Sequence, residues 1–317
     1  MRVNCLRISV TDRCNQRCVY CRPREDCDFI DRAEILRYEE IERITRLFAD
    51  CGIDSVRLTG GEPLVRRDVA SLVTALARTQ GIEQVALTTN GVLLESMAAD
   101  LKAAGLARVN VSLDSLQAKN YRKITGRDDL SRVLRGIHRA IEVGLQPVKI
   151  NAVILRRINI SQILALAALS IDLPVMVRFI EYCPTNGGTE PADDYVPYSE
   201  VRRMVEEKFG RLVDTVIVPG NGPASYFKIS GSAGTIGFIA GRSTIFCPSC
   251  NRIRLTSDGR IKPCLYSARQ YDVKTLLRDG TSDGQIRELL MQIIAHKPAI
   301  SRLDPFAEEF CMRKVGG

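Results

Sequence analysis

The first 180 residues alternate short apolar runs with segments of helical periodicity, and no other feature constrains the fold as strongly. Residues 38–50, for example, place apolar side chains at helical spacing and are followed by Gly52. Apolar runs that alternate with helices of this length indicate βαβ units and a parallel sheet. Strands are therefore predicted at residues 5–10, 55–59, 85–89, 109–113, 148–154 and 175–180.

Six such units predict an α/β fold, a partial (β/α)6 barrel resembling a TIM barrel, over residues 1–186. In barrels of this kind the chemistry lies at the carboxyl ends of the strands. Cysteine, glycine and polar residues do follow the predicted strands, at residues 11–21, 60–63, 88–91, 112–114 and 181–183. We therefore expect a site at that end of the barrel.

The alternating pattern stops near residue 186, and residues 187–317 are predicted to form a smaller part. A helix is expected at 201–209, short β-like runs at 213–218, 226–229 and 235–239, and a last helix at 285–294. This mixture predicts a C-terminal α+β part that covers the mouth of the barrel.

Composition narrows the class of protein. Hydrophobic residues make up 45% and charged residues 26% of the 317, as in soluble globular proteins. There is no apolar run of about 18 residues and no signal-peptide pattern at the start, so we expect no membrane span and a cytoplasmic location. The net charge of +8 is dispersed rather than gathered in basic blocks, which favours a small anionic ligand over nucleic acid.

Three of the eleven cysteines, Cys14, Cys18 and Cys21, lie on one short loop after the first strand. Three thiolates on such a loop can bind three irons of a [4Fe–4S] cube and leave the fourth iron open. Zinc is the alternative, but it normally takes four ligands and no histidine is near. The CxxxCxxC spacing is the signature of the radical S-adenosylmethionine superfamily.

A second group consists of Cys247, Cys250 and Cys264. A CxxC pair alone is often a zinc site. Cys183 or Cys311 could complete four zinc ligands, so spacing leaves zinc and a second cluster both open.

The residues around both groups resemble one family, the GTP 3',8-cyclases of molybdenum cofactor biosynthesis, which are radical S-adenosylmethionine enzymes. The resemblance extends from Leu6 to Gly317. Its motifs are the residues 6–15 and 20–21, 57–64, 88–91, 112–114, 124–127, 149–151, 246–255, 258–259 and 264–265, and the terminal Gly316-Gly317.

The resemblance implies S-adenosylmethionine and two [4Fe–4S] clusters as cofactors. The cluster on Cys14, Cys18 and Cys21 would bind and cleave S-adenosylmethionine, and the second cluster would keep an open iron for guanine. The implied S-adenosylmethionine contacts are Tyr20, Gly61, Glu62, Ser112 and Cys183, the last at a position where the family usually has methionine.

The implied substrate is GTP, whose ribose C3' would lose a hydrogen atom and then attack C8 of the base. Substrate contacts are expected at Arg7, Arg57, Thr88, Lys149, Arg252, Ile253 and Arg254, and catalytic roles at Arg252, Arg254, Gly316 and Gly317. Arginine suits a triphosphate because its guanidinium pairs with phosphate oxygens bidentately.

Alternatives remain open for these basic residues. Arg252 and Arg254 share one face of a strand, which could instead be solvated. Arg7, Arg57 and Lys149 lie on apolar strands, where a charge needs an anionic partner. That partner could be a ligand or an internal carboxylate.

Competing functions are a radical S-adenosylmethionine enzyme that modifies a peptide and a metal-bearing nucleic-acid binder. By resemblance, the partners would be a reductant protein, a downstream cyclic pyranopterin monophosphate synthase in the same pathway, and a second copy of the chain. Cys5, Cys27 and Cys51 are expected to be ordinary thiols, and the role of Cys311 stays open.

Overall fold

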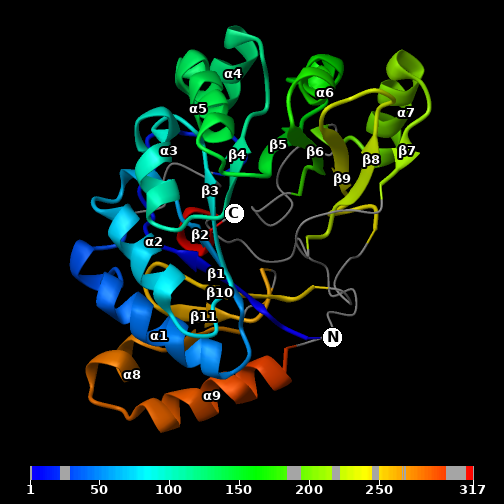
Figure 1. Cartoon of the computed structure of the whole chain (residues 1–317). Coiled ribbons are helices and arrows are strands. Elements are labelled where there is room, and N and C mark those ends of the chain that lie inside the picture. Colours follow the sequence, from blue (N-terminus) through cyan, green and yellow to red (C-terminus); the bar gives the residue numbers. More distant parts are fainter. Residues whose placement is uncertain are drawn as a thin grey trace.

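A computed structural model describes residues 2–21, 29–183, 194–215, 222–244, 250–265, 267, 269–297 and 312–316. Cys27, Cys247, Cys311, Gly317 and the predicted boundary at residue 186 lie outside these residues. The described residues form one twelve-stranded sheet in the order β12-β11-β10-β1-β2-β3-β4-β5-β6-β9-β8-β7 (Figure 1).

The six predicted strands are confirmed, and they pair in parallel in chain order. Their ends agree with the predicted ends to within one residue. They are β1 (Cys5–Ser9), β2 (Ser55–Thr59), β3 (Gln84–Thr89), β4 (Arg108–Ser112), β5 (Val148–Ile154) and β6 (Val175–Glu181). Together they form the predicted partial barrel.

Strands from the C-terminal part extend the sheet at both edges, which the sequence pattern did not indicate. β10 (Arg252–Leu255) pairs in parallel with β1, and β9 (Thr235–Ile239) pairs in parallel with β6. The antiparallel strands are β11 (Arg260–Lys262), β12 (Tyr271–Asp272), β8 (Ser225–Lys228) and β7 (Val213–Asp214). The edge of a sheet exposes unpaired backbone groups. This pairing gives the outer backbone groups of β1 and β6 hydrogen-bond partners. Strands that follow residue 186 in the chain thus belong to the same sheet as β1 to β6.

Helices pack on the outer face of the curved sheet (Figure 1). In α1 (Tyr38–Asp50), for example, Ile41, Ile44, Leu47 and Phe48 are fully buried, because one stripe of an amphipathic helix faces the core. The other expected helices are α2 (Val69–Arg78), α3 (Leu94–Ala103), α5 (Leu130–Glu142), α6 (Ile163–Asp172), α7 (Tyr198–Phe209) and α9 (Asp283–Ala295). None of the described helices is both long and apolar enough to cross a membrane.

Three helices were not predicted: α4 (Ala118–Thr125), α8 (Lys274–Arg278) and α10 (Met312–Val315). They are short, and brief segments give a weak periodic signal. The last of them lies inside the curve of the sheet, close to β1 and β2 (Figure 1). The C-terminal end of the chain therefore enters the barrel.

Candidate active site

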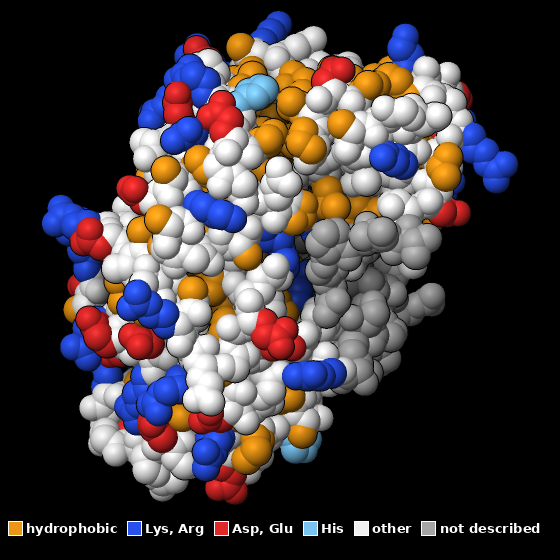
Figure 2. Space-filling view, in the orientation of Figure 1, with side chains coloured by type: hydrophobic (Ala, Val, Ile, Leu, Met, Phe, Trp, Pro, Cys, Tyr) orange, Lys and Arg blue, Asp and Glu red, His pale blue; other side chains and the backbone are white. Residues whose placement is uncertain are grey.

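The concave face of the sheet encloses a cavity of about 650 Å³. Residues of β1 to β6 and of β10 line it, together with Cys14, Cys18 and Cys21 of the first cysteine group. In Figure 2 basic side chains are visible in a recess at the centre of the molecule. Cysteine thiols and cations thus share one space.

The loop of the first cysteine group packs tightly against the turn after β2. Gly61 N donates a hydrogen bond of 2.7 Å to Thr11 O, and Glu62 N donates one of 2.7 Å to Arg13 O. A Cβ atom on Gly61 would lie 2.3 Å from Arg13 O, and one on Gly60 would lie 2.5 Å from Thr11 O. Both glycines are therefore required for the contact that positions the cysteine loop, whatever they do for a ligand.

The unpredicted helix α4 supports the same loop from another side. Arg17 N and Val19 N donate to the carbonyls of Thr125 and Ile124, at 2.8 and 2.9 Å. Gln16 Nε2 donates to Tyr121 Oη at 2.6 Å. The motif at residues 124–127 thus holds the loop, and its presence in the resemblance was the one signal for this role.

Asn90, which the sequence suggested was only a turn residue, also contacts the loop. Its Nδ2 lies 2.7 Å from Asn15 Oδ1 and 3.9 Å from Cys14 Sγ. Asn90, which follows β3, therefore connects this strand to the loop of the first cysteine group.

The three thiols of the first group lie at the rim of the cavity, and burial affects the pKa values of two of them. Burial raises the pKa of Cys14 to about 11, and the hydrogen bond with Cys21, together with burial, raises the pKa of Cys18 well above its usual value. Within the described part of the chain, no three Cys, His, Asp or Glu side chains converge as they would on one metal ion. In a cube each thiolate binds its own iron, and three thiols from one loop that line one cavity provide the ligands for three of the four irons.

The residues expected to contact S-adenosylmethionine all line this cavity. Tyr20 Oη donates to Asp114 Oδ2 at 2.6 Å, and Asp114 Oδ1 accepts from Val153 N at 2.8 Å. Gly61, Ser112 and Cys183 also line the cavity. The structure therefore brings the expected set together.

Glu62 is engaged more fully than the sequence suggested. Its buried carboxylate accepts hydrogen bonds from Thr89 Oγ1 at 2.6 Å, Asn90 N at 2.7 Å and Leu64 N at 3.1 Å. Burial raises its pKa to about 7, although these three donors oppose the shift. The carboxylate ties the ends of β2 and β3 together, in addition to lining the cavity.

Two cysteines of the second group are described, Cys250 and Cys264. Arg252 Nε lies 3.4 Å and Lys297 Nζ 3.5 Å from Cys250 Sγ. Burial opposes ionisation of this thiol, but the charges of Arg252 and Lys297 outweigh it and lower the pKa of Cys250 to about 7. A cationic surrounding of this kind stabilises a thiolate ligand.

The two cysteine groups belong to opposite ends of the barrel strands. Cys14 follows the carboxyl end of β1, whereas Cys250 precedes the amino end of β10, and these two strands are parallel. Cys264 follows β11, which runs antiparallel to β10 and so returns to the same end. A ligand that contacts both groups must extend through the cavity.

Between these ends, arginines occupy one row across neighbouring strands. Arg254 is paired with Arg7, Arg7 with Arg57, Arg57 with Ala86, and Ala86 with Arg108. Paired positions in a sheet point to the same face. The four arginines therefore come from β10, β1, β2 and β4 and point into one space, which they all line.

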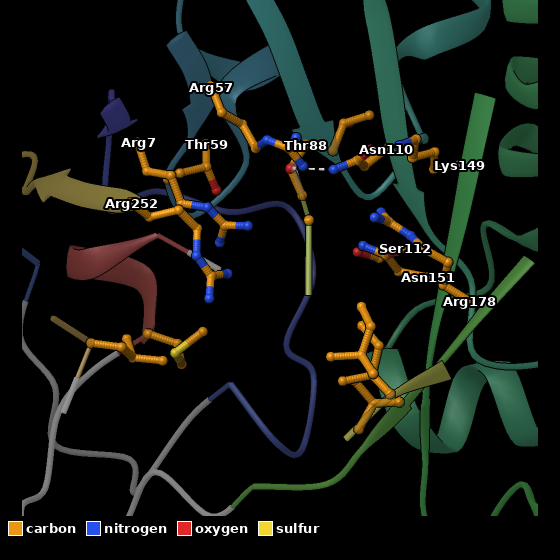
Figure 3. A pocket seen from close by; sticks show the side chains of 18 of the residues that line it. Arg7, Arg57, Thr59, Thr88, Asn110, Ser112, Lys149, Asn151, Arg178 and Arg252 are labelled. Carbon is orange, nitrogen blue, oxygen red and sulfur yellow. Dashed lines mark hydrogen bonds between the residues drawn. The ribbon is translucent and has the colours of Figure 1, made fainter. Parts of the chain in front are cut away.

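A second set of polar residues covers the opposite wall. In Figure 3, Lys149, Asn151 and Arg178 extend toward the space from one side, and Arg7 and Arg252 from the other. Between them Asn110 Nδ2 donates to Thr88 Oγ1 at 3.3 Å. Ile253 is different, because its side chain alternates to the other face of β10 and is fully buried in the hydrophobic core.

The basic residues depress one another's proton affinity. Burial, and then the charges of Arg178, Arg108 and Arg57, lower the pKa of Lys149 to about 6. Burial lowers the pKa of Arg7 well below its usual value, followed by repulsion from Arg254, Arg252 and Arg57. A cavity that concentrates positive charge in this way favours a polyanionic ligand.

The internal salt bridge that was left open for Arg7 and Arg57 is not seen. Among the described residues neither side chain forms an ion pair, and the Nε atom of Arg7 is buried without a hydrogen-bond acceptor. Because a buried charge needs a partner, the two arginines are placed to receive a ligand anion from the cavity that they line.

The C-terminal segment completes the cavity. Arg254 Nη1 donates to Gly316 O at 2.6 Å, and a Cβ atom on Gly316 would lie 2.3 Å from Thr59 Cγ2. Gly316 has a φ of 79°, which favours glycine. The family's two-glycine end thus has a structural reason at Gly316, while Gly317 lies outside the described residues.

Some cavity residues were missed in the sequence. Arg108, Asn110, Asn151 and Arg178 all line the cavity. Each lies within a strand of otherwise apolar character, so a buried polar residue on a parallel strand was the available signal.

Comparisons with known proteins agree with this geometry. Residues 8–169 match the model of the radical SAM superfamily, and residues 175–303 match the model named Molybdenum Cofactor Synthesis C. A GTP 3',8-cyclase of Pelotomaculum thermopropionicum is 46% identical over 99% of this chain and 98% of its own. Another, from Desulforamulus reducens, is 43% identical over 99% of this chain and 98% of its own.

Among solved structures, Streptococcus suis SuiB bound to S-adenosylmethionine is similar in fold. Its TM-score is 0.62, with 20% sequence identity over 98% of this chain and 77% of that one. This likeness concerns the fold alone.

Proposed function

This chain belongs to the GTP 3',8-cyclase family of radical S-adenosylmethionine enzymes, and we propose that it converts GTP to (8S)-3',8-cyclo-7,8-dihydroguanosine 5'-triphosphate. This reaction, a lyase step in the family's classification, begins molybdenum cofactor biosynthesis. The observation that supports this most is the cation-lined cavity that extends from the first cysteine group to Asn251 and Leu265, the neighbours of Cys250 and Cys264.

Cys14, Cys18 and Cys21 would hold the first [4Fe–4S] cluster. When bound, this cluster supplies the electron that cleaves S-adenosylmethionine to a 5'-deoxyadenosyl radical. The chain's own contribution is placement, because the glycines of the β2 turn and the carbonyls of α4 hold the loop. Tyr20, Gly61, Ser112 and Cys183 would contact S-adenosylmethionine, and Glu62 would fix the turn beside it.

Cys250 and Cys264, with Cys247, would hold a second cluster at the other end of the cavity. Arg252 and Lys297 support this assignment, since both direct a cationic donor at Cys250 Sγ. Hydrogen bonds to cluster sulfurs adjust the reduction potential. Guanine would lie at this end, and the ribose between the two groups.

The row of cations would bind GTP. A triphosphate carries several negative charges, and Arg7, Arg57, Arg252 and Arg254 place guanidinium groups in the cavity, to which Lys149 would add a charge on taking up a proton. Thr88 would contribute a hydroxyl, and Ile253 only its backbone. Arg254 and the Gly316 carbonyl that it binds would close the reaction space, and the terminal Gly317 would follow.

The test is anaerobic reconstitution, followed by incubation with GTP, S-adenosylmethionine and a reductant. We expect 5'-deoxyadenosine and the cyclic nucleotide to form together and only when GTP is present. Formation of 5'-deoxyadenosine at the same rate without GTP would favour the peptide-modifying alternative. The relatives do not favour that alternative, because the curated proteins that match nearly the whole chain are named GTP 3',8-cyclases.

The reductant protein, the downstream synthase, the homodimer and the cytoplasmic location stay predictions. So does the division into residues 1–186 and 187–317.

A further inference from the structure

Arg108 is a buried cation of the cavity to which neither the motifs nor the proposed mechanism assigns a role. It begins β4, its side chain is 4% exposed, and it lines the cavity. Within the described part of the chain its guanidinium makes no hydrogen bond and no ion pair, and its Nε atom is buried without an acceptor. An arginine buried in this way is costly unless something binds it.

Register places Arg108 in the same row as three arginines of the proposed GTP site. The row continues from Arg254 through Arg7 and Arg57 to Ala86, and Arg108 occupies the next paired position. Ala86 contributes only a methyl group between the two arginines. No side chain of β3 larger than this methyl group therefore lies between Arg57 and Arg108 at this position of the sheet.

The electrostatic surroundings of Arg108 are also those of a ligand site. Its charge lowers the pKa values of Lys149 and Arg178, while burial and the charge of Arg57 lower its own. Figure 3 shows Arg57, Lys149 and Arg178 around the same space. Three arginines and Lys149 within one enclosure disfavour one another's charged forms, and a polyanion relieves that repulsion.

We infer that Arg108 binds phosphate oxygens of the nucleotide and contributes to the preference for a triphosphate over a nucleoside. The inference rests on the proposed function. Arg108 would act together with Arg57 across Ala86, as a pair of donors to the phosphate chain. Guanine and ribose would not touch it.

The experiment compares GTP, GMP and guanosine binding to the reconstituted full chain in the presence of S-adenosylmethionine. Arg108→Met keeps the length of the side chain and removes its charge. We expect it to weaken GTP binding about tenfold to a hundredfold, as for other hydrogen bonds to charged groups. Guanosine binding should stay within about twofold of the parent protein, since the lost contact is to phosphate.

Stability without nucleotide gives an independent readout. Removing one of several repelling buried cations should raise the melting temperature of the nucleotide-free protein. Arg108→Lys, which keeps the charge but loses the bidentate geometry, should fall between parent and Arg108→Met in GTP affinity. Arg135→Met removes an exposed arginine paired with Glu95 on the outer surface, and should change neither quantity.

The outcomes separate the two levels of the hypothesis. If the parent does not bind GTP, the proposed function fails. If the parent binds GTP and Arg108→Met binds it equally well, only the role of Arg108 is overturned. Equal weakening of GTP and guanosine, together with a lower melting temperature, would instead assign Arg108 to the fold and also overturn the inference.

Discussion

Arg254 and Gly316 join the sheet to the C-terminal end of the chain, through a hydrogen bond of 2.6 Å from Nη1 to the glycine carbonyl. The two residues are 62 positions apart in the sequence. The carbonyl takes part of the hydrogen-bonding capacity of a cation that faces the cavity. The position of the tail and the charge available to a substrate are therefore coupled.

Gly316→Ala tests this coupling. The new Cβ atom would lie 2.3 Å from Thr59 Cγ2 at a φ of 79°, so we expect the tail to leave its seat and turnover to fall at least tenfold, the size of effect that misplacement near the reacting groups produces. The measurement is the rate of cyclic nucleotide formation.

Gly231→Ala is the matched control for that variant. Gly231 has a φ of 77° and nothing within 4 Å of its added Cβ, so only the backbone strain of about 1 kcal/mol remains. Thr59→Ser in the Gly316→Ala background removes the clashing methyl group and should restore part of the rate. No recovery in the double variant would contradict the clash as the cause.

Gly61→Ala should damage the first cluster and spare the second. An alanine Cβ would lie 2.3 Å from Arg13 O and 2.8 Å from Asp12 O, which displaces the loop of Cys14. We expect reconstituted iron to fall toward half and S-adenosylmethionine cleavage to be lost. Gly284→Ala, at a position whose nearest neighbour lies 4.0 Å away, should retain all iron. Full iron content in Gly61→Ala would count against this packing role.

The two cysteine groups should be separable by mutation. Cys14→Ala and Cys264→Ala are each expected to halve the iron and sulfide content. Cys264→Ala should still cleave S-adenosylmethionine slowly, whereas Cys14→Ala should not, because only the first group lies beside the proposed contacts for that cofactor. The measurements are the iron and sulfide content of each variant and the amount of 5'-deoxyadenosine formed. A parent protein that takes up only one cluster per chain would refute the two-site hypothesis.

The lowered pKa of Lys149 predicts that GTP binding depends on pH. Burial and neighbouring cations lower its pKa to about 6, so at pH 8 the free protein holds this amine largely neutral. A bound polyanion favours the charged form, so binding should take up a proton, and affinity should fall up to about tenfold per pH unit above pH 6. Calorimetry at pH 8 in two buffers of different ionisation enthalpy measures that uptake.

Lys149→Met should abolish the proton uptake, while Arg135→Met should keep it. The same shift affects folding. Because the folded pKa lies below the unfolded value, the unfolded chain binds more protons between about pH 6 and pH 10.4, and stability rises with pH across that window. A Lys149→Met protein with the parent's pH dependence would exclude Lys149 as the titrating group.

The sequence by itself determined the features that depend on near neighbours. The alternation of strands and helices predicted the ends of β1 to β6 to within one residue. A parallel strand that is buried on both faces has a continuous run of apolar residues, which is easily recognised. The spacing of Cys14, Cys18 and Cys21 identified the superfamily, since one short loop carries all three. The motif at residues 246–255 is also one continuous stretch, and it indicated which family within that superfamily the chain resembles.

Only the tertiary structure decided which distant residues meet. No local pattern indicates that β10 pairs with β1, that Arg108 joins the row of Arg254, Arg7 and Arg57, or that Gly316 seats on Thr59. These relations follow from strand register and from the closing of long loops, which are set by the packing of the whole sheet. A single arginine in a strand is ambiguous in sequence, whereas four in one row enclose a site for an anion.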